Sequence, residues 1–127
     1  MAVKWNPGHY VSSTDNLESA LREIEPLPFM RGAAARVNWS QLEPAKGSYD
    51  FEPLNYRLKT CEKFGRQLIL LLSWKGFGSS ASPAYLKSDE SAGGVLPIRP
   101  KTTGPGDNIK LWQPRVLERV QELITAL

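Results

Sequence analysis

The chain has 127 residues, of which 41% are hydrophobic, 9% aromatic and 23% charged. This composition is typical of a globular domain and excludes a disordered, collagen-like or coiled-coil protein. Sixteen basic and thirteen acidic residues give a formal charge of +3. The basic residues are scattered, so we expect no nucleic-acid partner. The longest apolar run, Leu68 to Leu72, is far shorter than the roughly 18 residues that cross a bilayer, so we expect no membrane partner either.

The first part of the chain alternates predicted strands and helices. Residues 3–11 are predicted to form a strand that runs into a loop. A helix should follow, because Leu17, Leu21 and Ile24 recur at helical spacing and Asp15 is placed to begin its first turn.

A second strand is predicted over residues 33–39, and a second helix follows it. Asp50 is placed to cap this helix and Gly65 to end it. The apolar stripe of the helix consists of Phe51, Leu54, Leu58, Cys61 and Phe64. Residues 66–73 then read as a third strand, whose continuous apolar run indicates burial on both faces. Cys61 falls on the helical stripe, so we interpret it as a core residue.

The pattern changes after the third strand. Residues 75–111 are rich in Gly, Pro and Ser, which predicts a long loop. A last helix is predicted from Pro114, with Val116, Val120, Leu123 and Leu127 along one face. The order strand, helix, strand, helix, strand is typical of right-handed β-α-β units and a parallel sheet, so the expected fold class is α/β.

Few catalytic chemistries fit the composition. Cys61 and His9 are the only cysteine and histidine, and no G-x-S-x-G motif provides a nucleophilic serine. The glycine-rich fingerprints of nucleotide-binding proteins are absent as well. We therefore expect neither a metal nor a cofactor.

The stretch from Arg36 to Phe51, R-V-N-W-S-Q-L-E-P-A-K-G-S-Y-D-F, resembles the second strand and following loop of clan A glycoside hydrolases. The next helix ends in Phe64-Gly65 before an apolar strand, as in those enzymes. Pro83-Ala84-Tyr85-Leu86 looks like an element of glycoside hydrolase family 42 beta-galactosidases. The resemblance implies that residues 1–127 form a single partial domain, the N-terminal portion of a TIM (β/α)8 barrel, from a retaining hydrolase of O-glycosyl bonds.

Arg36 is the supporting catalytic candidate. In the family, the matching arginine lies inside the barrel and hydrogen-bonds the carboxylate nucleophile, and Arg36 inherits this role by position. Strand alternation places Arg36 and Asn38 on the face opposite Val37 and Trp39. A structural ion pair or a position at the barrel rim remains an alternative for Arg36.

Substrate-binding candidates are aromatic, amide and cationic residues placed at or beyond the carboxyl ends of predicted strands, where barrel enzymes collect active-site residues. They are Trp5, Asn6, His9, Tyr10, Asn38, Trp74 and Lys75. Their expected ligand is a carbohydrate. Glu43 belongs to the Leu-Glu-Pro turn, and we expect it to be structural.

Glycoside hydrolysis needs two carboxyl groups. In clan A these follow the fourth strand, in an Asn-Glu pair, and end the seventh. The sequence contains no Asn-Glu pair, so this chain alone is expected to be inactive. Open edges and an uncovered inner sheet face would favour self-association or a complementing chain. The alternatives are a non-catalytic carbohydrate-binding or interaction module and a small flavodoxin-like domain.

Overall fold

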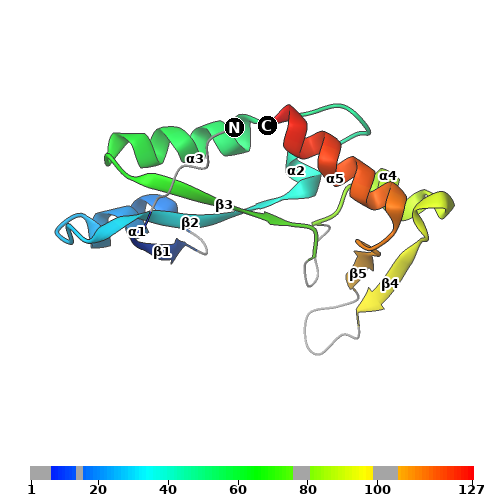
Figure 1. Cartoon of the computed structure of the whole chain (residues 1–127), viewed down its shortest axis with the longest axis horizontal. Helices are drawn as coiled ribbons and strands as arrows, with labels where there is room; N and C mark the ends of the chain where they lie inside the picture. The colour runs from blue at the N-terminus through cyan, green and yellow to red at the C-terminus, as the bar shows by residue number, and fades with distance from the viewer. Residues whose placement is uncertain (1–6, 14–15, 76–80, 99–105) are drawn as a thin grey trace. The chain divides into compact units, whose positions relative to one another are not determined.

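The computed structural model describes residues 7–13, 16–75, 81–98 and 106–127. It divides into two compact units, which we describe separately: the first comprises residues 1–36 and 54–71, and the second comprises residues 37–53 and 72–127. The elements are drawn in Figure 1. In chain order they are β1 (His9–Ser13), α1 (Leu17–Ile24), β2 (Met30–Asn38), α2 (Trp39–Leu42), α3 (Glu52–Lys63), β3 (Gln67–Ser73), α4 (Ala84–Ser88), the 3-10 helix η1 (Glu90–Ala92), β4 (Val95–Ile98), β5 (Gly106–Ile109) and α5 (Pro114–Ala126).

The first three strands form a parallel sheet in the order β1-β2-β3, which confirms the α/β class. In the register of β1 and β2, Tyr10 lies opposite Gly32 and Ser13 opposite Ala35. Position 32 requires a glycine because the backbones of β2 and β3 approach closely there. A Cβ at Gly32 would lie 1.8 Å from the carbonyl oxygen of Gln67 on β3.

Helices α1 and α3 bury one face of this sheet. Leu21 of α1, Ala33 and Ala35 of β2 and Cys61 of α3 belong to one buried cluster. Cys61 is therefore a core residue, as expected, and burial raises the pKa of its thiol. Alanines in β2 leave room for the helices to approach the sheet closely.

The other face of the sheet is more exposed than the sequence predicted. Along β3, exposed residues alternate with partly buried ones, and Ile69 and Leu71 are 40% and 42% exposed. The prediction that this strand is buried on both faces is therefore wrong, because the helices cover one face only.

The boundaries of the first strand and helix differ from the predicted ones. β1 begins at His9, after Pro7 and Gly8, and continues to Ser13. Residues 3–6 of the predicted strand lie outside the described residues. Asn16 caps α1, since its Oδ1 accepts the N–H of Ser19 at 3.0 Å. The expected capping residue, Asp15, is also outside the described part.

The later helices start and end as their local chemistry predicts. The carboxylate of Asp50 accepts the N–H of Glu52 at 3.0 Å at the start of α3. Gly65 ends that helix with a φ of +61°, in the left-handed region that suits glycine. α5 begins at Pro114, and it buries Val116 and Leu123.

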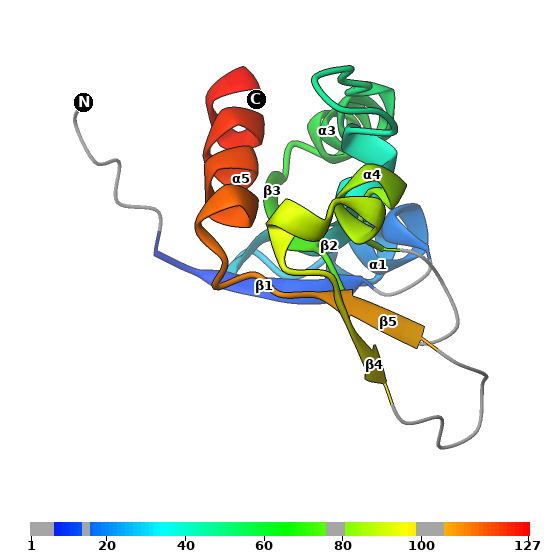
Figure 2. The same ribbon diagram turned by 90° about the vertical axis from the view of Figure 1, so that its right-hand side faces the viewer.

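The segment from 75 to 111, predicted as a long loop, contains regular structure. Helices α4 and η1 are followed by β4 and β5, which form an antiparallel hairpin with Val95 opposite Ile109 (Figure 2). The loop prediction is wrong here because β4 contains Pro97 and β5 begins with Gly106, residues that weaken a strand signal in sequence.

Candidate functional site

A cavity of about 290 Å3 lies at the carboxyl ends of β1 and β2 in the first unit. This is the edge of a parallel sheet at which α/β proteins bind ligands. Its lining residues come from the end of each strand, the start of α1 and the first half of α3. They are Ser13, Asn16, Leu17, Glu18, Ala35, Arg36, Tyr56 and Arg57.

The start of α1 is fixed by its cap and by ion pairs. Glu18 accepts from Arg22 Nη2 at 2.7 Å and from Lys63 Nζ of α3 at 3.4 Å. These contacts, Arg22 first, hold the pKa of Glu18 below its usual range. Glu18 is therefore ionised at neutral pH and forms a solvent-exposed ion pair between α1 and α3.

Arg36 is exposed, although the resemblance implied a position inside a barrel. Its neighbours Ala35 and Val37 are buried, and Asn38 is half-buried. The predicted alternation is therefore confirmed from Ala35 to Asn38, whereas Trp39, which was predicted to continue the strand, begins α2. Among the described residues none forms an ion pair or a hydrogen bond with Arg36, so the alternative of a structural ion pair gains no support from them.

His9 and Tyr10 do not lie at the carboxyl end of the sheet. They are the first two residues of β1, and His9 pairs with Met30 at the start of β2. Tyr10 donates its hydroxyl to Gln67 Oε1, 2.6 Å away at the start of β3. Both residues thus belong to the amino edge, and the reason for choosing them as substrate-binding candidates does not hold. The prediction misplaced them because it ended the strand at Val11.

The other five substrate-binding candidates lie either outside the described residues or at the carboxyl ends of strands. Trp5 and Asn6 lie outside the described residues. Asn38 ends β2 and caps α2, and its N–H donates to Gln41 Oε1 at 3.1 Å. Trp74 follows β3 and is 37% exposed, and Lys75 next to it is exposed. Asn38, Trp74 and Lys75 therefore do lie at or beyond the carboxyl ends of their strands, as predicted.

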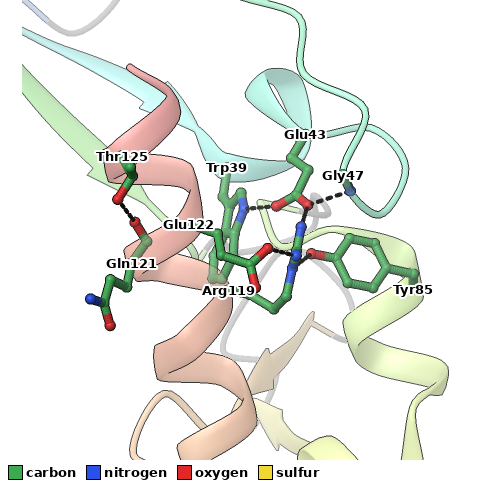
Figure 3. Close-up of polar contacts among 8 residues, drawn as sticks. All are labelled: Trp39, Glu43, Gly47, Tyr85, Arg119, Gln121, Glu122 and Thr125. Atoms are coloured by element: carbon green, nitrogen blue, oxygen red, sulfur yellow. Dashed lines mark hydrogen bonds and ion pairs between the residues drawn. The ribbon is translucent and has the colours of Figure 1, made fainter.

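The most buried polar residue group lies in the second unit, around Glu43, whose side chain is fully buried (Figure 3). Glu43 Oε2 accepts the indole N–H of Trp39 at 2.8 Å, and Oε1 accepts the N–H of Gly47 at 2.9 Å. Oε1 also pairs with Arg119 of α5, whose Nε donates to the Tyr85 hydroxyl at 3.1 Å. We call Trp39, Glu43, Gly47, Tyr85 and Arg119 the Glu43 cluster.

The pKa values of Glu43 and Tyr85 differ from their ordinary values. Burial opposes ionisation of Glu43, but the hydrogen bonds from Gly47, Trp39 and Arg119 outweigh it and keep the pKa of Glu43 below its usual range. Burial and the neighbouring Glu43 carboxylate raise the pKa of Tyr85 to about 12. At neutral pH Glu43 is therefore ionised and Tyr85 protonated. Neither is suited to be a general acid or base, which agrees with the expected structural role of Glu43.

Sequence analysis missed the partner of Glu43 and most of the cavity lining. Arg119 is 76 residues away from Glu43, so no local pattern connects them. Tyr56 and Arg57 lie off the apolar stripe of the predicted helix, and no motif singled them out. The sequence held one signal for the Glu43 cluster, the Leu-Glu-Pro turn. A buried carboxylate that orders a turn must accept hydrogen bonds, so donors to Glu43 could have been looked for.

The part of the chain that the structure describes contains neither a group of potential metal ligands nor a membrane-spanning helix. No three His, Cys, Asp or Glu side chains there are grouped to hold a metal ion. None of the helices there has the length and apolar character needed to cross a membrane. In comparisons with known proteins, no family model matches the chain and no curated protein does so either.

Proposed function

We propose that the chain provides the first β-α units of a TIM-barrel glycoside hydrolase that cleaves O-glycosyl bonds with retention. The observation that carries the proposal is the position of Arg36. It lies near the carboxyl end of β2, in the strand whose flanking residues Ala35 and Val37 are buried. Arg36 lines the cavity at the carboxyl ends of β1 and β2, where it is placed to serve a carboxylate that reaches this edge of the sheet.

The parallel β1-β2-β3 sheet supports the proposal at the level of the fold. The first two strands are each followed by a helix that packs on one face, as in the repeating unit of a (β/α)8 barrel. In such a barrel the opposite face is the interior, where exposed Ile69 and Leu71 would be buried.

A non-catalytic interaction module is the second candidate, and the same two apolar residues favour it. Exposed apolar side chains on a sheet face mark a surface that another chain can cover. In this reading the occupant is a second copy or a complementing chain, with or without a bound carbohydrate.

The two candidates differ in what the natural gene product does. Its intact mass and its turnover of a panel of aryl glycosides should be measured beside those of the 127-residue chain. We expect turnover by the natural product and none by the 127-residue chain, which has no pair of carboxylates assigned to catalysis. Turnover by the 127-residue chain, or a natural product that binds sugars without cleaving them, would contradict the hydrolase.

A further inference from the structure

The second unit has a groove of its own. Its volume is about 430 Å3, and it is formed by the turn after α2 and the last turns of α5. The lining residues are Tyr49, Gln121, Glu122, Thr125 and Ala126. The groove is shallow and widely open to solvent, so it would hold a ligand along one side only.

The Glu43 cluster fixes both walls of the groove. Glu43 binds the N–H of Gly47 in the turn and pairs with Arg119 on α5, so it ties the two walls together (Figure 3). The ring of Tyr49 stacks on Phe51 with centroids 5.7 Å apart and an angle of 9° between the planes. A ligand would therefore meet a wall that is largely held in place before binding.

The charges at the groove are balanced. Glu122 is its only charged lining residue, and this carboxylate pairs with Arg119. The guanidinium of Arg119 is shared with buried Glu43. The groove therefore offers neither an unpaired cation for an anionic ligand nor an isolated carboxylate for a cation.

Apart from Glu122, the groove is lined by neutral groups that form hydrogen bonds and by apolar groups. Gln121 and Tyr49 carry both donors and acceptors, and the Thr125 hydroxyl, which donates to the carbonyl of Gln121 at 2.8 Å, retains acceptor capacity. The Tyr49 ring and the Ala126 methyl group are apolar. A pyranose matches this set, because it has ring-carbon faces and hydroxyls that both donate and accept.

We propose that this groove is a binding site for an uncharged sugar ring. The site shares no lining residue with the Arg36 cavity and does not depend on hydrolysis. It gives the second unit a carbohydrate-holding role whether or not the natural protein is an enzyme.

The test is an NMR titration of the 127-residue chain with glucose, galactose and glucuronate. We expect saturable shifts of the Tyr49 ring and the Gln121 side-chain amide with a neutral sugar, and weaker binding of glucuronate. Replacing Tyr49 by Ala should weaken binding about 3- to 10-fold, as expected for loss of one aromatic contact. Tyr49→Phe should keep most of the affinity.

Trp112→Ala is the matched control, since Trp112 is an exposed aromatic residue of the second unit that does not line the groove. It should bind like the unchanged chain. The inference is overturned if no sugar shifts Tyr49, if glucuronate binds as tightly as the neutral sugars, or if Tyr49→Ala and the control bind equally. Each of these results leaves the hydrolase proposal intact, because that proposal is judged by turnover of the natural product.

Discussion

At the scale of single residues, the buried carboxylate of Glu43 is the strongest constraint in the second unit. Desolvation alone would disfavour its charge. Hydrogen-bond donors offset this cost: the indole of Trp39 in α2, the N–H of Gly47 in the turn and the guanidinium of Arg119 in α5. Removing these donors would leave the buried charge of Glu43 unpaired, which is costly in free energy. The Leu-Glu-Pro motif thus has a structural explanation within the described residues.

Replacing Glu43 by Gln should lower the free energy of unfolding by about 1.5–3 kcal/mol, because it removes the buried charge that accepts hydrogen bonds from Trp39, Gly47 and Arg119, while Arg119 keeps its pair with Glu122. Urea denaturation followed by circular dichroism measures this loss. Glu118→Gln, an exposed substitution on α5, is the control and should change little. Equal midpoints for both variants would show that the Glu43 cluster does not stabilise the fold.

The same carboxylate makes stability depend on pH. The pKa of Glu43 is lower in the folded state than its ordinary value, so its contribution is complete above the unfolded pKa and is lost as pH falls through the folded pKa. The Glu43 contribution should be constant from pH 7 to about pH 5 and should be lost below that, so we expect urea midpoints to fall below about pH 5 and to fall less in Glu43→Gln. Parallel curves for the two proteins would contradict this assignment, since exposed carboxylates such as Glu18 are present in both.

At the scale of elements, the sequence predicted well wherever a local rule decides the structure. The helices over 52–63 and 114–126 follow from apolar spacing, Asp50 and Pro114, and the strand over 67–73 follows from its apolar run. The β4–β5 hairpin could not be predicted, because it is stabilised by pairing across a long connection rather than by its own residues. The start of β1 was misjudged for a related reason: its register depends on β2, not on the residues beside Pro7.

Gly65 offers a test of one such local rule. No atom outside the turn lies within 4 Å of a Cβ built at this position, so a substitution there is affected by backbone conformation alone. Gly65→Ala should cost about 1–2 kcal/mol, the usual penalty of a left-handed φ. Gly65→Asn should cost less, because asparagine tolerates this region. Thermal unfolding of the two variants gives the comparison, and equal losses would point to another cause.

At the scale of the whole molecule, the parallel sheet is covered by helices on one face, while Ile69 and Leu71 are exposed on the other. Three parallel strands also leave the outer edges of β1 and β3 free of partners among the named strands. Apolar surface of this kind favours association. The candidate Arg36 site could be placed on its strand from sequence, but its cavity could not, because Tyr56 and Arg57 reach it only through the packing of α3.

Sedimentation velocity should therefore detect self-association of the 127-residue chain at micromolar concentration. Ile69→Lys should shift it toward monomer, because a charge on the sheet face opposes burial. Phe29→Lys replaces an exposed aromatic residue elsewhere in the first unit and should leave association unchanged. A chain that stays monomeric on dilution and on concentration would count against this use of the sheet face.

The most direct measurement is kcat/KM against pH for the natural gene product with Arg36→Ala, beside Arg31→Ala as an exposed arginine of the same strand. If Arg36 keeps a catalytic carboxylate ionised, Arg36→Ala should lower kcat about 100-fold or more and move the acidic limb of the profile to higher pH. Arg31→Ala should do neither. An unchanged profile in Arg36→Ala would contradict the assignment of this strand to a glycosidase barrel.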